Sequence, residues 1–443
     1  MQKRNDLYYR IIGVGSSIIL VLLPFHALFT TFFASHFAHF DLIRIWKEIL
    51  LLGLCIVAII ILFKDLTLLK KSIKNRVVQA GILYLTAIAI ATIYGLLVGN
   101  VNRNAAIYGF IIDTRYVLFL GVVSLAAHRY RFHWEKLVFI PAILVIIFSI
   151  LQMTILPKEF LAHFGYGRNT IPLFETIDGK QSFFRVQSTL RGPNAFGAYM
   201  MLICTLLFAE VIKTRKKRIY VYITSAASLI ALYGSYSRGA WIGLMVSLVC
   251  FSLWSIQDPT KKKQVYIVTA LAVLFVGIVT VSLRNNDIAQ NMLFHTNEKS
   301  TSLQSSNEQH SSALKSGVKD IYNTPLGKGV GSAGPASLRN TKMSRIAENY
   351  FLQIGQEAGL IGLGLFMLFI AMLGKSLWDK HTEVLPRAVL AILVGTIFIN
   401  MLTHAWADDT LAYVFFGMAG IAIVGTSTKS KKILKYSIKK PVN

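Results

Sequence analysis

Long apolar segments, separated by short polar ones, recur along the whole chain. An α-helix needs about 20 mostly apolar residues to cross the hydrocarbon core of a bilayer. Segments of this kind begin near residues 11, 45, 77, 105, 137, 194, 219, 240, 265, 351, 388 and 410. The pattern predicts an all-α polytopic membrane protein with about twelve transmembrane helices, organised as one integral membrane domain over residues 1–443.

The composition agrees with this prediction. Hydrophobic residues make up 54% of the 443 residues and charged residues only 15%, whereas a soluble domain has about 25% charged residues. A surface that faces lipid needs little charge. The cysteines Cys55, Cys204 and Cys250 all lie in apolar segments, so we expect core residues and neither disulfides nor metal ligands.

The net charge of +25 is carried by short basic clusters between the apolar segments. Cytoplasmic loops of membrane proteins are enriched in Lys and Arg, so the clusters predict that both termini are cytoplasmic. No basic-aromatic motif is present, and nucleic-acid binding is not expected. With the N-terminus inside, most of the 46 basic residues fall in cytoplasmic segments, namely residues 1–10, 64–76, 128–136, 213–218, 257–264, 375–387 and 426–443.

This topology leaves two larger external loops, residues 157–193 and 284–349. In the second loop, residues 296–312 are rich in Ser, Gln and Asn, which predicts a flexible segment. Residues 316–334 contain Pro and repeated Gly, which predict turns leading back to the membrane. Neither loop is long enough to predict a separate soluble domain.

Basic residues on the external side are informative because the topology rule does not explain them. Four lie at or near external ends of spans: Arg185, Arg191, Arg238 and Lys328. Arginine pairs bidentately with phosphate, so arginines that converge at the outer surface would suit a lipid-linked diphosphate. The alternative is that each side chain extends to lipid head groups or caps a helix.

Polar residues also mark the span that begins near residue 351. Glu348 precedes it, where a helix dipole favours an acidic group. Glu357 lies within the apolar segment, where a carboxylate is costly unless it is paired. Glu357 is therefore a candidate for a functional site or a buried polar network.

Two other pairs carry weaker signals. Asp113 and Arg115 are two residues apart in one span, point to different sides of it and should contact other spans. His404 and Asp408 are four residues apart at the last external turn and are compatible with a His–carboxylate pair. The chain has no P-loop, dinucleotide fingerprint or Cys/His cluster, so neither a cofactor nor a metal site is expected.

Three ordered segments resemble the O-antigen ligase and O-antigen polymerase family of bacterial membrane glycosyltransferases. Residues 237–244 read Ser-Arg-Gly-Ala-Trp-Ile-Gly-Leu, residues 323–331 read Asn-Thr-Pro-Leu-Gly-Lys-Gly-Val-Gly, and residues 348–362 begin Glu-Asn-Tyr-Phe-Leu. The resemblance covers residues 185–364, and it covers the rest of the chain by topology alone.

The resemblance implies a multi-pass enzyme of the bacterial cytoplasmic (inner) membrane. It would transfer or polymerise glycan from an undecaprenyl-diphosphate-linked donor onto an acceptor hydroxyl, in a cell-surface polysaccharide of the O-antigen, exopolysaccharide or teichuronic acid type. No nucleotide or metal would be needed, and the partners would be the lipid-linked glycan, membrane lipid and an acceptor glycan or glycolipid.

The resemblance also implies roles by position. Arg191 and Arg238 would bind the diphosphate and stabilise its charge as the sugar departs, and Glu348 would act as the base. The further substrate-binding candidates are Arg185, Lys328, Asn349 and Tyr350.

One position departs from the family pattern, because ligases of the family commonly carry His where this chain has Glu348. An ionised carboxylate can also accept the proton of a hydroxyl. The departure favours a polymerase, or a ligase with a different acceptor, and leaves these two open.

Two other functions are alternatives to the enzyme. In a multi-span transporter for a small anion, Asp113, Arg115 and Glu357 would line a path. A transporter needs charges near the middle of the membrane, whereas most unexplained charge here is at outer ends of spans, which favours the enzyme. A non-catalytic scaffold for polysaccharide assembly is the third alternative.

Overall fold

The structure is a computed structural model that describes residues 2–37, 39–177, 180–213, 219–267, 306–342, 345 and 348–425. Its regular structure is almost entirely helical. The principal helices are α1 (Gln2–Leu22), α2 (His26–Phe37), α3 (Phe40–Arg44), α4 (Trp46–Lys64), α5 (Leu66–Ile73), α6 (Arg76–Leu97), α7 (Arg103–Ala127), α8 (Trp134–Thr154), α9 (Pro193–Lys213), α10 (Ile219–Gly234), α11 (Arg238–Ser255), α14 (Ser306–Asn323), α15 (Tyr350–Trp378), α16 (Val384–Leu402) and α17 (Asp409–Val424).

The prediction of an all-α polytopic membrane protein is confirmed. Among the described residues, 9 helical segments are long and apolar enough to cross a membrane, and α10 and α17 are shorter apolar helices. The first span, Asp6–Phe37, joins α1 to α2 through a 3₁₀ turn at Leu23–Phe25. Every expected span corresponds to one of these helices except the one near residue 265, most of which lies outside the described residues.

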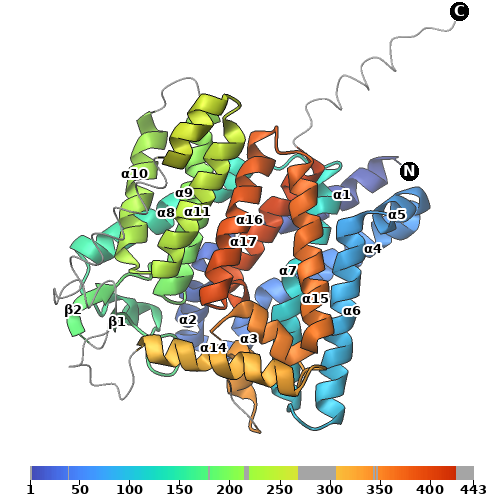
Figure 1. Cartoon of the computed structure of the whole chain (residues 1–443), viewed down its shortest axis with the longest axis horizontal. Helices are drawn as coiled ribbons and strands as arrows, with labels where there is room; N and C mark the ends of the chain where they lie inside the picture. The colour runs from blue at the N-terminus through green and yellow to red at the C-terminus, as the bar shows by residue number, and fades with distance from the viewer. Residues whose placement is uncertain are drawn as a thin grey trace, which may run out of the picture.

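The spanning helices run up and down side by side, with α7, α15, α16 and α17 near the centre (Figure 1). Helix α11 packs on α16, α15 on α6, and α17 on α7. The lower end of the bundle in Figure 1 carries α3, α14 and the two strands, and we call it the loop end. The opposite end, here the basic end, carries α5 and the basic connections at residues 128–133 and 379–383.

The first large loop contains short elements of regular structure. A 3₁₀ helix, η2 (Phe160–Phe164), is followed by an antiparallel hairpin of β1 (Glu175–Ile177) and β2 (Lys180–Arg185). Glu175 pairs with Arg185 across this hairpin. The hairpin therefore brings Arg185 to a defined place at the loop end.

The prediction of a flexible segment at residues 296–312 is wrong from Ser306 onward, where α14 begins; the preceding residues lie outside the described part. Helix α14 lies across the loop end (Figure 1). Its Ile321 is buried and approaches Gly355 of α15 closely. Polar composition suggested flexibility, but Gly317 and Ile321, one turn apart on α14, both pack against α15.

The glycine-rich segment at residues 325–331 inserts between α6, α7 and α15. Gly329 has a φ of +100° and lies so close to Gly95 of α6 that a β-carbon on Gly329 would be 2.3 Å from the Gly95 Cα. Gly331 has a φ of +91°, and a β-carbon there would be 2.5 Å from the Ala105 carbonyl oxygen of α7. Glycine is required at both positions, by conformation and by space.

Helix α15 is interrupted where this segment packs on it. Gly359 has a φ of +69° and breaks the helix. The freed backbone groups bond to the inserted segment: the Leu360 amide donates to the Pro325 carbonyl at 2.9 Å, and the Gly329 amide donates to the Glu357 carbonyl at 2.9 Å. The break is therefore filled by backbone partners, as apolar surroundings require.

Candidate functional site

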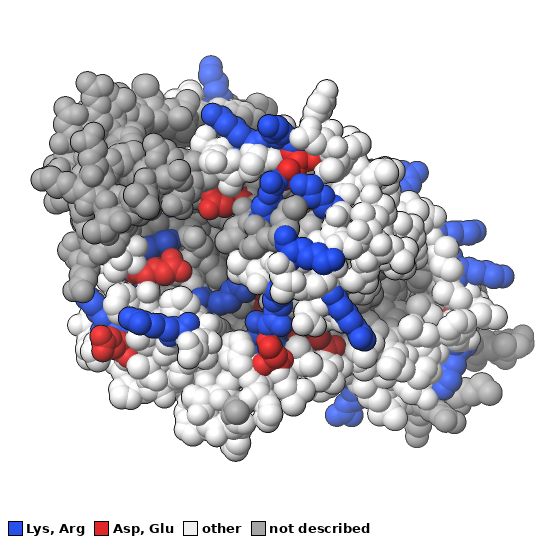
Figure 2. Space-filling view, turned by 90° about the horizontal axis from the view of Figure 1, so that it is seen from below, with Lys and Arg blue, Asp and Glu red and all other residues white. Residues whose placement is uncertain are grey.

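Charged side chains gather at the loop end. Figure 2 views this end from below and shows Lys and Arg side chains spread over it, with Asp and Glu between them. They come from segments far apart in the sequence, among them Arg44 in α3, Arg191 before α9, and Arg339 in the 3₁₀ helix η4 (Gly334–Arg339).

A cavity of about 300 Å³ opens here beside the first turn of α17. Its wall combines the guanidinium groups of Arg44 and Arg191, the carboxylates of Asp408 and Asp409, and the ring of Tyr108. We call it the Arg191 cavity. Its other lining residues are His26, Ala27, Thr30, Phe40, Thr170, Ile171, Pro172 and Thr410. Polar groups that converge on a concave surface are typical of a ligand site.

Arg191 is the least constrained cation of this cavity. Within the described residues its guanidinium makes no hydrogen bond and no ion pair within 4.0 Å, and its side chain is exposed at the cavity mouth. The loss of water around Arg191 lowers its pKa, but the carboxylates of Asp408 and Asp409 raise it by more. The net pKa of Arg191 is therefore above its ordinary value. The group is a permanent cation available to an anionic ligand.

Asp408 faces Arg191 from the N-terminal start of α17. Its Oδ1 caps the helix, accepting hydrogen bonds from the Thr410 amide at 3.0 Å and the Leu411 amide at 3.3 Å. Burial raises the pKa of Asp408, and Arg191 acts in the opposite direction. Asp408 thus caps the helix and also supplies a negative charge that faces Arg191 in the cavity.

Two arginines, Arg44 and Arg339, pack on the ring of Tyr108 in α7. The guanidinium carbons of Arg44 and Arg339 each lie 4.7 Å from the centroid of its ring, within the range of a cation–π contact. Arg339 is also held by Asp41 at 2.6 Å. Arg44 and Tyr108 were not predicted from sequence; a basic residue just before the second span was the available signal for Arg44.

Arg185 and Arg238 form a second cationic pair on the other side of the α9 start. Arg185 donates to Asn194 Oδ1 at 2.6 Å and to the Ser235 carbonyl at 3.2 Å, and it pairs with Glu175 at 3.2 Å. Burial lowers the pKa of Arg185, Glu175 raises it, and the nearby charge of Arg238 lowers it. Arg185 is therefore bound by protein groups, and it lies close enough to Arg238 for the two positive charges to repel each other.

Glu348 and Asn349 lie at the start of α15, next to the end of α16. Asn349 caps α15 by accepting from the Leu352 amide at 3.0 Å, and its Nδ2 donates to the Met401 carbonyl at 2.9 Å. Gly239, the neighbour of Arg238, faces Leu402 on the same helix end. The sequence neighbours of Arg238 and Glu348 therefore contact the same turn of α16.

Tyr350, expected to bind substrate, is instead fully buried with 0% of its surface exposed. Its hydroxyl donates to Asp113 at 3.1 Å and bonds to the Tyr116 hydroxyl at 3.1 Å. The carboxylate of Asp113 lies close to that of Glu357, whose Oε1 accepts from the Gly331 amide at 2.9 Å. Tyr350 contributes to the core of the bundle, because its ring packs against Phe366 and Trp406.

Lys328 is held in an ion pair. Its Nζ lies 3.1 Å from Asp320 Oδ1 of α14, and its amide donates to the Gln356 carbonyl at 2.8 Å. Asp320 also contacts Arg345 and accepts from Gln356 Nε2 at 2.9 Å. Lys328 thus ties α14 to α15 and does not line the Arg191 cavity.

A buried ionic cluster lies inward of the cavity. Lys47 of α4 lies 3.1 Å from Glu48 and 3.1 Å from Asp409. Arg115 of α7 pairs with Glu48 at 3.2 Å and also contacts Asp409. The prediction that Arg115 and Asp113 contact other spans is confirmed. Opposite charges satisfy one another inside the bundle, as buried charges must.

The described residues contain no group of three or more His, Cys, Asp or Glu side chains arranged to hold a metal ion. The residues that meet at the loop end are arginines, carboxylates, an aromatic ring and hydroxyls. Such a set can bind an anion next to a polar, ring-shaped ligand, and its carboxylates can accept a proton.

The fold and this basic loop end define a polytopic helical membrane protein with a candidate anion site at one end of the bundle. The sequence model of a protein family described as "O-Antigen ligase" matches residues 223–367, a region that includes Arg238, Lys328 and Glu348. A protein described as "O-antigen polymerase" from Salmonella muenchen is 26% identical over 220 residues, which are 48% of this chain and 52% of that relative.

The chain is similar to proteins of the O-antigen ligase and O-antigen polymerase family, as the three sequence segments predicted. It matches about half of the length of the Salmonella relative. Arg185 and Arg191 precede the region that the family model covers.

Proposed function

We propose that this protein is a membrane glycosyltransferase that uses an undecaprenyl-diphosphate-linked glycan as its donor at the loop end. The sugar would pass to an acceptor hydroxyl on a growing polysaccharide or on another glycan or glycolipid. The observation that carries this proposal is Arg191: a cation at the mouth of a cavity, without a hydrogen-bond partner among the described residues. The family match adds that related proteins act in O-antigen synthesis.

The proposal places the loop end outside the bacterial inner membrane and both termini in the cytoplasm. Dense basic clusters at residues 64–76, 128–136 and 375–387 connect helices at the opposite end. Such clusters favour the cytoplasmic side. A lipid-linked donor in the outer leaflet would then have its diphosphate at the depth of the Arg191 cavity.

In the proposed reaction, the acceptor oxygen forms a bond to the anomeric carbon of the donor sugar while the bond from that carbon to the diphosphate oxygen breaks. The diphosphate leaves with the bonding electron pair. Arg191, Arg44 and Arg238 supply positive charge where the leaving group gains negative charge, which is electrostatic catalysis without a metal or nucleotide. Arg185, held by Asn194 and Glu175, positions the Arg238 side of the site.

The proton of the acceptor hydroxyl passes to Glu348, which is partly exposed at the start of α15. Its proximity to the Arg238 side of the site, across the last turn of α16, supports this role. Asn349, anchored at both ends of its side chain, would hold Glu348 at that position.

A transporter is supported less well. The inward charges Lys47, Arg115 and Glu357 are bonded to protein groups, and the break in α15 is filled by the glycine-rich segment. These features suit a stable frame around an external site better than a conduction path.

The proposal is tested in cells that lack the native gene and carry single variants. Arg191→Ala or Arg238→Ala is expected to abolish or shorten the surface polysaccharide. Arg103→Ala is the matched control, because Arg103 is an exposed arginine that begins a helix at the same end. Unchanged amount and length of polysaccharide in the two site variants, at equal protein levels, would overturn the proposal.

A further inference from the structure

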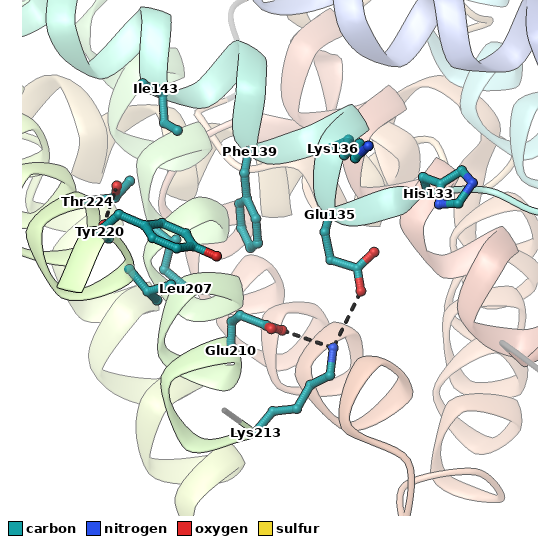
Figure 3. A pocket seen from close by; sticks show the side chains of 11 residues that line it. His133, Glu135, Lys136, Phe139, Ile143, Leu207, Glu210, Lys213, Tyr220 and Thr224 are labelled. Carbon is teal, nitrogen blue, oxygen red and sulfur yellow. Dashed lines mark hydrogen bonds and ion pairs between the residues drawn. The ribbon is translucent and has the colours of Figure 1, made fainter. Parts of the chain in front are cut away.

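A second cavity lies at the basic end, far from the Arg191 cavity. It has a volume of about 450 Å³ and lies between the start of α8, the end of α9 and the start of α10 (Figure 3). This size is within the range of small-molecule sites. None of its lining residues takes part in the proposed transfer reaction.

The rim of this cavity carries both signs of charge. Lys213 at the end of α9 lies 3.2 Å from Glu210 and 3.4 Å from Glu135 of α8 (Figure 3). His133 and Lys136 also lie on the rim, next to Glu135. The rim therefore carries two carboxylates and two ammonium groups, so it suits a zwitterionic group better than a simple anion.

The inner wall is apolar. Phe139 and Ile143, one turn apart on α8, face Leu207 of α9 across the cavity (Figure 3). Tyr220 of α10 lies beside them, and its side chain is exposed. A polar rim above an apolar wall is the profile of an amphiphile site.

The position of the cavity also matches a membrane interface. Its charged residues stand at helix ends, where Lys and Glu side chains meet the head-group layer, and its apolar wall continues into the span. Lys213 lies 5.7 Å from the ring of Trp134, and Trp and Tyr are enriched at this depth. Cavities with basic groups between transmembrane helices are known lipid head-group sites.

We propose that this cavity binds one phospholipid with an amine-bearing zwitterionic head group, of the phosphatidylethanolamine class. The ammonium group would donate to Glu135 and Glu210, and the phosphate would accept from Lys136 and Lys213. An acyl chain would follow Phe139 and Ile143 along α8. With the termini in the cytoplasm, as proposed above, the lipid belongs to the inner leaflet.

The simplest competing view is that Lys213, Glu135 and Glu210 only tie α8 to α9. If these side chains only link α8 to α9, the purified protein should retain no particular lipid in the cavity. If the cavity binds lipid, the protein should retain it. The test therefore measures bound lipid and does not rely on enzymatic activity, so it can fail or succeed independently of the proposed function.

The full-length protein is purified in a mild detergent with equal amounts of phosphatidylethanolamine, phosphatidylglycerol and phosphatidylcholine, and bound lipid is counted by native mass spectrometry. One phosphatidylethanolamine per chain is expected. Ile143→Trp, which fills the cavity, is expected to reduce this occupancy at least about tenfold. Leu144→Trp is the matched control, because Leu144 is exposed on another face of α8 and does not line the cavity.

A second variant tests the head group. Glu135→Gln combined with Glu210→Gln is expected to remove the preference for phosphatidylethanolamine over phosphatidylglycerol, while the apolar wall is unchanged. Equal retention of the three lipids by the wild type, retention of phosphatidylglycerol alone, no retained lipid, or equal occupancy in Ile143→Trp and wild type would each overturn the proposal.

Discussion

Arg191 and Asp408 face one another across the same cavity, and Asp408 is the strongest influence raising the pKa of Arg191. Asp408 is fixed by its bonds to the first amides of α17, whereas Arg191 has no such bonds in the described part of the molecule. In this pair an anchored carboxylate faces a cation that is available to a ligand. An incoming diphosphate would compete with Asp408 for Arg191.

Arg191→Ala is expected to lower kcat/KM for glycan transfer about 100-fold, the usual effect of removing one donor that stabilises a developing anion. Arg191→Lys should restore part of this loss, because it keeps the charge and loses the planar fork. Rates are measured with purified protein and lipid-linked donor. Arg168→Ala, an exposed arginine in the same loop, should match the wild type; equal rates for Arg191→Ala and Arg168→Ala would refute the role.

Arg44→Ala is expected to raise KM for the donor about tenfold, as the loss of a charge-assisted hydrogen bond does. The change in kcat should be smaller, because Arg44 lies on the cavity wall with its charge over Tyr108. Steady-state kinetics against donor concentration separate the two constants. An unchanged KM would show that the donor does not occupy the Arg191 cavity.

Asp408→Asn is expected to lower KM for the donor about fivefold at neutral pH, because about 1 kcal/mol of repulsion toward the diphosphate is removed. Asn retains the ability to cap α17. A higher KM in this variant would contradict the competition between Asp408 and the donor.

The same competition predicts a pH dependence. Burial raises the pKa of Asp408, so its carboxylate loses its charge at a higher pH than an exposed Asp does. As the pH falls through this raised pKa, the KM of the wild type for the donor should decrease toward the value of Asp408→Asn. The variant should show no change in this range, and parallel profiles would refute the assignment.

Gly329→Ala is expected to destabilise the fold by about 2 kcal/mol or more, because Ala is strained at a φ of +100° and its β-carbon meets Gly95. Thermal unfolding in detergent measures the effect. Gly364→Ala is the control, since a β-carbon at Gly364 in α15 has open space around it. Equal melting temperatures for the two variants would show that the glycine-rich segment does not pack tightly against α6.

The helices were predictable from sequence because the bilayer demands long apolar segments, and α9, for example, begins within one residue of its expected start. The partners of Arg115 were not predictable, because Glu48 and Asp409 come from helices distant in sequence. The same reason hid the arrangement of Arg44, Tyr108 and Arg339, which meet only in the folded bundle. The burial of Tyr350 was not predictable, because it depends on which way a helix end faces.

The candidate site was predicted in part. Arg191 was selected from sequence as an external arginine, and its place in a cavity is what makes it the leading residue. The motif that contains Lys328 was also selected, but its glycines and its ion pair with Asp320 serve packing between α6, α7, α14 and α15. Sequence alone cannot separate these cases, since both combine a basic residue with glycine or proline.

The most direct test of glycan transfer uses the purified protein with an undecaprenyl-diphosphate oligosaccharide, with and without an added acceptor. Chain growth or transfer to the acceptor is expected, with one undecaprenyl diphosphate released per bond formed, and both should be lost in Glu348→Gln and Arg191→Ala. No product from the wild type, or full transfer by both variants, would contradict the proposed function.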